Sequence, residues 1–221
     1  MTTTEVLTQI HQKLAAYYDL DRWHWREETT PYDICVGSIL VQHTAWTNVE
    51  KALANLREAG IDSVEKLVAL PDDDLAALVL PSGTPTVKAR RLHAFAGLVL
   101  SYGGFEGLFA QPENDLRRVL LATPGIGPET ADVIMLYAAR LPAIVHDAYT
   151  ARLMRRLGHG PEGERYDTWR AWLDELLPQD AAYRRAHHAA IVVHCKQLCR
   201  VRPKCSACPL SGVCRYAANG K

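Results

Sequence analysis

Hydrophobic residues recur along the chain three and four positions apart, and no stretch alternates in the manner of a β-strand. Short breaks with glycine or proline separate the periodic segments, as at Gly60, Pro71 and Gly103. The pattern predicts an all-α protein, a bundle of about ten short helices, with Ser63 and Asp72 as N-caps. The predicted helices span Val6–Tyr18, Pro31–Val41, Thr47–Ala59, Ser63–Ala69, Asp72–Leu78, Val87–Ser101, Asn114–Ala122, Glu129–Ala139, Ala148–Leu157, Thr168–Leu177 and Ala181–Cys195.

Composition indicates an ordinary globular protein. The chain has 221 residues, 48% hydrophobic and 23% charged, which is enough to bury a substantial core. The segment Met1–Ile10 is polar and mixed, unlike a signal or transit peptide, and no apolar run approaches the roughly 20 residues that cross a bilayer. We therefore expect a cytoplasmic protein without a membrane partner, whose six cysteines are metal ligands or buried thiols and not disulfides.

Charge is distributed unevenly although the net charge is zero. From Arg184 to Lys221 there are eight Lys/Arg and no acidic residue, so the rest of the chain holds 25 − 8 = 17 basic against 25 acidic residues. A basic tail of this kind can follow a phosphate backbone. The alternative is a tail that only adds solubility, but the cysteines within it favour an ordered segment.

The segment from Leu121 to Leu136 predicts two helices joined by a tight turn. Pro124 ends the first helix, Gly125 and Gly127 permit positive φ angles, and Pro128 opens the second helix. Such a turn can present several backbone N–H groups at a helix N-terminus and so bind a phosphate. An ordinary αα-hairpin without a ligand is the competing interpretation.

An aspartate opens the next predicted helix. Asp147 follows Glu129 by eighteen residues and precedes three arginines, the first of which is Arg152. It can be a helix N-cap only, or a catalytic carboxylate.

Four cysteines lie within 16 residues at the C-terminal end, in the spacing Cys199-x5-Cys205-x2-Cys208-x5-Cys214. One close pair flanked by two distant ligands favours an iron–sulfur cluster over a zinc site, which usually has two close pairs. Cys195 could replace Cys199, and Cys35 is expected to be a small buried hydrophobic residue. The cations interleaved with these cysteines are candidate DNA contacts: Lys196, Arg200, Arg202 and Lys204.

These motifs together resemble the endonuclease III superfamily of helix–hairpin–helix DNA glycosylases. Thr123–Ala131 is similar to its hairpin, Val145–Asp147 to the segment that bears its catalytic aspartate, and the cysteine run to its 4Fe–4S loop. Pro31–Thr44 also matches, and the resemblance spans roughly residues 28–216. The branch that includes bacterial 3-methyladenine DNA glycosylases is the most similar.

The resemblance implies a monomeric base excision repair glycosylase that acts on damaged double-stranded DNA and holds one 4Fe–4S cluster on Cys199, Cys205, Cys208 and Cys214. It also implies a two-lobed fold. Residues 27–135 would form a six-helix barrel domain, with the helix–hairpin–helix at about 114–140. Residues 1–26 and 136–221 would form the second lobe, which carries Asp147 and the cluster loop, 196–216, and the substrate cleft would lie between the lobes.

Departures from the family pattern bear on the chemistry. Glu129 occupies the position of the lysine with which endonuclease III attacks the sugar, and no lysine occurs between Lys88 and Lys196. Ser38 occupies the position of the glutamate acid of adenine glycosylases. Asp147 alone remains, which suits monofunctional hydrolysis of a weakened glycosidic bond, such as that of an alkylated purine.

The resemblance further implies how the DNA is held. His43 and Thr84 would fill the gap left by a flipped base, and the other expected contacts are Gln42, Gly125, Ile126, Gly127, Thr130 and Arg152. Gly83–Thr86 departs from the family's loop, and a monovalent cation could bind the hairpin backbone. Trp23, Trp25 and Trp46 would line the base pocket, or else pack in the core.

Three other functions stay open. The chain could be a damaged-DNA-binding homologue that has lost catalysis, because Glu129 and the Thr84 loop are altered. It could be a classical oxidised-pyrimidine glycosylase and AP lyase that uses another amine. It could also be a zinc-stabilised interaction module unrelated to DNA.

Overall fold

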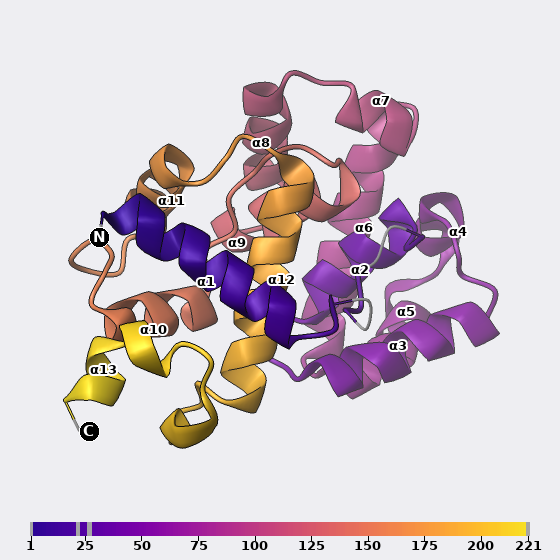
Figure 1. Ribbon diagram of the computed structural model, residues 1–221. Coiled ribbons are helices and arrows are strands. Elements are labelled where there is room, and N and C mark those ends of the chain that lie inside the picture. The colour runs from indigo at the N-terminus through magenta and orange to yellow at the C-terminus, as the bar shows by residue number, and fades with distance from the viewer. Residues whose placement is uncertain (1, 21–22, 26–27, 220–221) are drawn as a thin grey trace. The chain divides into compact units, whose positions relative to one another are not determined.

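The protein is described by a computed structural model that covers residues 2–20, 23–25 and 28–219 (Figure 1). Within these residues the regular elements are all helices, so the all-α prediction is confirmed. The chain divides into two compact units. We call Glu27–Leu141 the hairpin unit, and Met1–Arg26 with Pro142–Lys221 the cysteine unit. The division falls after Leu141, six residues later than the boundary predicted at 135.

The hairpin unit is built around one buried helix. Every residue of α2 from Ile34 to Leu40 is buried, so this helix is hydrophobic on all sides. Thr30 caps its N-terminus by accepting a hydrogen bond from the Asp33 N–H at 3.1 Å. The elements of this unit are α2 (Pro31–Leu40), α3 (Trp46–Glu58), α4 (Val64–Ala69), α5 (Asp72–Val79), η2 (Leu80–Ser82), α6 (Pro85–Ser101), α7 (Phe105–Phe109), α8 (Glu113–Ala122), α9 (Pro128–Val133) and η3 (Ile134–Ala138).

Two helices and the turn between them close this unit. An ion pair holds α8 to α9, because Arg117 donates to both carboxylate oxygens of the fully buried Asp132 at 2.9 and 3.2 Å. Beyond α9 the chain widens into the π-helical segment η3, where the N–H of Ala139 donates to the carbonyl of Ile134. The turn is therefore fixed from behind by a buried charge pair.

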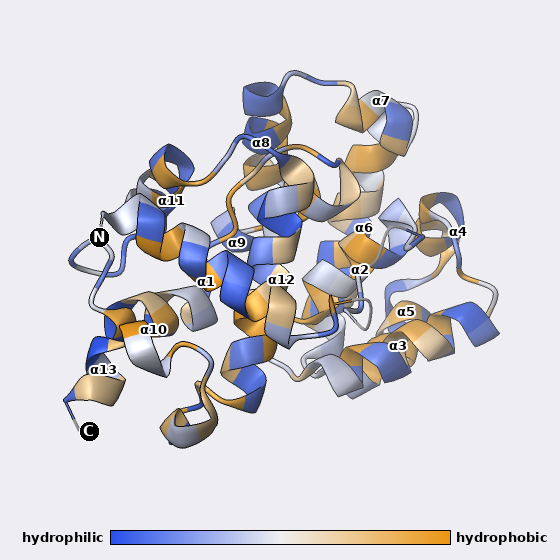
Figure 2. Ribbon diagram, viewed as in Figure 1, coloured by the Kyte–Doolittle hydropathy of each residue, from blue (hydrophilic) through white to orange (hydrophobic). Residues whose placement is uncertain are grey.

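The cysteine unit has its own hydrophobic core, formed where α1 crosses α12 (Figure 1). Hydrophobic and hydrophilic bands succeed one another along α1 (Figure 2). Its hydrophobic residues Leu7, Ile10 and Leu14 are buried in the core. A capping box of Thr2 and Glu5 begins this helix. The elements of the unit are α1 (Thr3–Tyr17), α10 (Ala148–Leu157), α11 (Tyr166–Leu176), α12 (Ala181–Gln197), η4 (Cys205–Ala207), η5 (Ser211–Val213) and α13 (Arg215–Ala218).

The predicted helices correspond to observed ones, with differences at their ends. Ser63 caps α4 as predicted, whereas the prediction for Asp72 is wrong: Pro71 is the cap residue of α5 and Asp72 lies in its first turn. The short helices α7 and α13 were not predicted. Among the described helices, none is both long and apolar enough to cross a membrane.

Candidate functional site

Asp147 is the N-cap of α10, and its two carboxylate oxygens have different surroundings. Oδ1 accepts hydrogen bonds from the N–H of Thr150 at 2.7 Å and from its hydroxyl at 2.8 Å. Oδ2 lies 3.7 Å from Nε2 of His188, and the side chain is 11% exposed. Burial alone would raise the pKa of Asp147, but the hydrogen bond and charge of His188 and the Thr150 donors outweigh it and lower the pKa. The site thus holds an ionised carboxylate whose second oxygen is not used by the cap.

Aromatic rings lie beside His188, the histidine that faces this carboxylate. The Trp23 ring meets the His188 ring edge-on with centroids 6.1 Å apart, and Trp25 meets Trp23 in the same way at 6.1 Å. Both tryptophans are only 8% exposed. Trp46 belongs to the hairpin unit, where its Nε1 donates to Glu50 at 3.1 Å. Of the three predicted pocket tryptophans, the structure therefore brings Trp23 and Trp25 together beside His188.

The four predicted cluster cysteines line one small cavity, together with Leu153, Leu210 and other apolar side chains. Among the described residues, no three His, Cys, Asp or Glu side chains are grouped so that they could hold a single metal ion. The donor set is nevertheless of the soft, all-thiol kind that iron–sulfur clusters use. Cys195 is absent from the cavity lining, and its Sγ lies 3.6 Å from the Tyr149 carbonyl oxygen. Cys199, Cys205, Cys208 and Cys214 together fit the implied cluster.

Two residues that sequence reasoning missed contact these sulfurs. Arg156 donates to Sγ of Cys199 at 3.2 Å, to the Arg200 carbonyl at 2.7 Å and to the Val201 carbonyl at 3.0 Å. The fully buried His194 has Nε2 3.6 Å from Sγ of Cys208. Hydrogen bonds from Cys195, His194 and Arg156 lower the pKa of the Cys199 thiol, which favours its thiolate form.

Arg152 also bonds to the chain around Cys199. Its Nε donates to the Cys199 carbonyl at 3.0 Å and its Nη2 to the Cys195 carbonyl at 3.3 Å. This guanidinium stabilises the end of α12. The sequence had suggested a DNA contact for Arg152 and not this role. The sequence shows that α10 carries three arginines, but not which of them turn toward the cysteines.

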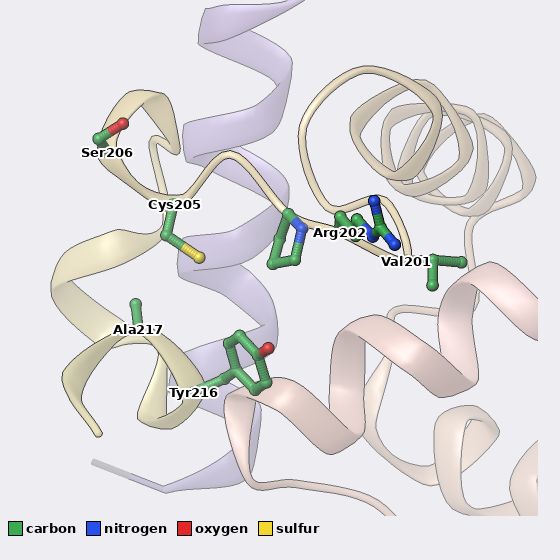
Figure 3. A pocket seen from close by; sticks show the side chains of 7 residues that line it. Val201, Arg202, Cys205, Ser206, Tyr216 and Ala217 are labelled. Carbon is green, nitrogen blue, oxygen red and sulfur yellow. The ribbon is translucent and has the colours of Figure 1, made fainter. Parts of the chain in front are cut away.

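The surface of the cysteine loop is basic, although less so than the residue count suggests. Lys196, Arg200, Arg202 and Lys204 are all exposed. Arg184, which was counted with them, is only 2% exposed and forms an ion pair with Asp174 at 2.8 Å. An open pocket of about 570 Å³ lies on this surface, with Arg202 at its edge and the side chains of Cys205 and Tyr216 directed into it (Figure 3).

The predicted hairpin turn is present in the other unit. Gly125 has φ +86°, a conformation that an L side chain rarely adopts, and Gly125 and Gly127 are both exposed. The Ile126 side chain is buried, and its N–H closes the turn by donating to the Thr123 carbonyl at 3.1 Å. The turn therefore offers fewer free N–H groups than the sequence suggested, because that of Ile126 is used and Pro128 has none.

Gln42 is bonded to the hairpin. Its Nε2 donates to the Gly125 carbonyl and to the Thr130 hydroxyl, both at 3.0 Å, while Arg91 donates to its Oε1. This side chain, predicted to contact DNA, is thus held on the turn. Arg91 gave no signal in the sequence, because its partners lie in segments distant along the chain.

The two predicted insertion residues share an unusual backbone conformation. His43 has φ +57° and Thr84 has φ +44°, and both are exposed. A non-glycine residue in this region costs of the order of 1–3 kcal/mol and is especially unusual for a β-branched residue such as threonine. Strained, exposed residues of this kind cluster at functional sites.

Glu129, Lys88 and Ser38, the residues that bear on the predicted chemistry, differ in exposure. Glu129 lies exposed in the first turn of α9, where the family has its lysine. Lys88 is 1% exposed, and its Nζ donates to the Leu40 carbonyl at 2.7 Å and to the Ser82 carbonyl at 2.5 Å. Burial, and then the charge of Arg91, lowers the pKa of Lys88.

Ser38 is buried in α2, and its hydroxyl donates to the Cys35 carbonyl. Cys35 is fully buried, as predicted.

Comparison with known proteins shows which family the chain resembles. The family described as "HhH-GPD superfamily base excision DNA repair protein" matches residues 36–179. A relative from Methanocaldococcus jannaschii, whose name describes it provisionally as a DNA repair glycosylase, is 37% identical over 95% of this chain and 96% of its own length.

Two solved structures are also similar. The 3-methyladenine DNA glycosylase of H. pylori, bound to 1,N6-ethenoadenine, has a TM-score of 0.75 and 26% identity over 89% of this chain and 98% of that chain. An endonuclease III–DNA complex has a TM-score of 0.81 over 100% and 99% of the two chains, at 22% identity, and so shares the fold.

Proposed function

Because the chain belongs to the HhH-GPD superfamily of base excision DNA repair proteins, we propose that it is a monofunctional DNA glycosylase in which Asp147 assists hydrolysis of the N-glycosidic bond. One observation carries the proposal: Thr150 holds one oxygen of an ionised, largely enclosed carboxylate, and the cap does not use the other oxygen, which lies 3.7 Å from Nε2 of His188. A carboxylate so placed can stabilise the positive sugar of the transition state or accept a proton from the attacking water. His188 would orient it.

The residue at the hairpin position supports hydrolysis without strand cleavage, because Glu129 stands where endonuclease III has its lysine. A Schiff base needs an unprotonated amine at C1′, and Glu129 cannot form an imine. Lys88, the last lysine before Lys196, is buried and donates to two carbonyls, so it does not serve as that nucleophile. The alternative of an AP lyase that uses Lys88 is thereby weakened.

Alkylated purines are the proposed substrates. One carboxylate is sufficient where the leaving base is already good, and a purine with a positive ring is such a base. The glycosylase of H. pylori that resembles this chain was solved with 1,N6-ethenoadenine, which is a modified purine. The base would be flipped out of the duplex at a cost of a few kcal/mol.

The proposed DNA contacts are those predicted ones that the structure leaves exposed. Duplex DNA would contact the exposed turn at Gly125 and Gly127, the His43 and Thr84 loops and the four exposed cations of the cysteine loop, and a monovalent cation could bind the turn carbonyls. Cys199, Cys205, Cys208 and Cys214 would hold one 4Fe–4S cluster, which would order the basic loop and has no assigned part in hydrolysis. We propose a monomer that acts on DNA in the cytoplasm.

The test is a lesion panel that compares wild type with Asp147→Asn on duplexes bearing 3-methyladenine, 1,N6-ethenoadenine, uracil or thymine glycol. The amide keeps the oxygen that accepts from Thr150 but loses the charge, so base release should fall by about 10²–10⁴-fold while DNA affinity stays within a few-fold. Asp180→Asn is the matched control, because Asp180 caps α12 in the same way by accepting from the Tyr183 N–H.

Two results would contradict the proposal. Unchanged base release in Asp147→Asn would mean that Asp147 is a helix cap only. Binding without release of any base by the wild type would favour the damaged-DNA-binding alternative. Asp147→Ala removes the helix cap as well as the charge, so it should also lower the free energy of unfolding by about 1 kcal/mol. Comparing it with Asp147→Asn separates the two effects.

A further inference from the structure

The ammonium group of Lys88 lies between two chain segments that are 42 residues apart. It donates to the carbonyl of Leu40, the last residue of α2, and to that of Ser82, the last residue of η2. The last carbonyls of a helix lack partners within it and carry the negative end of its dipole. Lys88 therefore binds two helix ends at once, and at 1% exposure water does not replace it.

Each of these carbonyls is closely followed by a strained, exposed residue. His43 comes three positions after Leu40 with φ +57°, and Thr84 comes two positions after Ser82 with φ +44°. Such conformations persist only where the surroundings hold them in place. The lysine supplies a fixed point immediately before each loop.

A second cation on the same helix extends the arrangement. Arg91 follows Lys88 by three residues on α6, so both side chains lie on one face. Arg91 donates to Gln42, which in turn bonds to Gly125 and Thr130 of the hairpin. The Arg91 stem also lies against Gly125, so closely that a Cβ on this glycine would overlap the Cγ of Arg91. One face of α6 thus reaches three segments of the proposed DNA-contacting surface.

We propose that Lys88 is a positioning residue, which holds the His43 loop and the Thr84 loop in register so that both enter the duplex together when a base is flipped. The inference rests on the proposed function for the flipping step. The restraint on the two loops stands on the geometry alone. Lys88 does not touch the reacting atoms.

Lys88→Met tests the proposal, because methionine keeps an apolar stem and removes the donors. Hydrogen exchange of the amides in 41–44 and 82–86 should become at least about tenfold faster, while those in 125–131, held through Arg91, stay unchanged. The fluorescence of 2-aminopurine next to a 1,N6-ethenoadenine lesion should show several-fold less flipping, with affinity for undamaged duplex within about twofold. Arg90→Gln, on the same helix but exposed, is the control for lost positive charge.

The outcomes distinguish the two proposals. Unchanged exchange in both loops overturns the positioning role, and so does faster exchange with unchanged flipping. Faster exchange in a protein whose wild type neither flips nor releases any base overturns the proposed function and leaves the restraint supported. Thr84→Gly, which adopts positive φ without strain, should recover part of the stability lost in Lys88→Met. A Lys88→Met chain that fails to fold both alone and with Thr84→Gly overturns the proposal, since the lysine would then serve the whole core.

Discussion

Acid should destabilise this protein through one buried histidine. His187 on α12 is 4% exposed, and neither ring nitrogen has a hydrogen-bond partner among the described residues. It stacks on Tyr183 with centroids 6.1 Å apart and on His11 at 5.9 Å. Burial, followed by the charges of His11 and His188, lowers the pKa of His187 from 6.5 to about 3. The folded protein therefore keeps this ring neutral.

The sign and size follow from proton linkage. Since the folded pKa of His187 is the lower one, the unfolded chain binds the proton more readily, and stability falls as the pH drops below 6.5 toward about 3. At pH 5 the unfolded ring is charged and the folded ring is not. At about 1.4 kcal/mol for each unit of pH below 6.5, the loss from this residue is about 2 kcal/mol.

Urea unfolding followed by circular dichroism at pH 7 and pH 5 measures this loss in wild type and in His187→Phe. Phenylalanine keeps a ring in the stack and removes the titrating group. The variant should lose about 2 kcal/mol less than wild type between the two pH values, while the other histidines contribute equally to both. Equal losses in the two proteins would refute the reasoning and would mean that water or a proton reaches His187 in the folded state.

Three further predictions concern the cysteine loop and the strand chemistry. Cys208→Ala should abolish the visible absorption band of the cluster and make the loop sensitive to protease; a coloured, stable variant would contradict the ligand assignment. Binding of duplex DNA should weaken with salt, and replacing Arg200, Arg202 and Lys204 together by glutamine should reduce the slope of log K against log salt by up to about 3. Binding that ignores salt in the wild type would refute a role for these cations. Borohydride should trap little or no covalent complex of the wild type with DNA, whereas Glu129→Lys should trap some; efficient trapping by the wild type would show that another amine reaches the sugar.

Most of the helices could be predicted from local sequence patterns. Helix α10, Ala148–Leu157, has the predicted bounds because Asp147 caps it and Gly158, at φ +88°, ends it. Helices α7 and α13 escaped prediction because five and four residues give too short a period to recognise.

The site was predictable where spacing encodes it, as in the cysteine run, and not where distant residues meet. His194 contacts Cys208 from the adjoining helix, and Arg156 reaches Cys199 across 43 residues of chain. The strain at Thr84 was equally hidden, because nothing in the residue type announces a positive φ. Long-range contacts of this kind depend on packing, which no local pattern records.

Helix α10 links the carboxylate of Asp147 to the cysteine loop. Its N-terminus is set by Asp147, and Arg152 and Arg156, five and nine residues later, hold the cysteine loop. At 1.5 Å per residue the carboxylate and the second clamp are about 14 Å apart on one rigid rod. If Asp147 acts as proposed, a substitution that shifts the cysteine loop also shifts the helix that this carboxylate caps, so damage at the cysteines would be felt in the hydrolysis step.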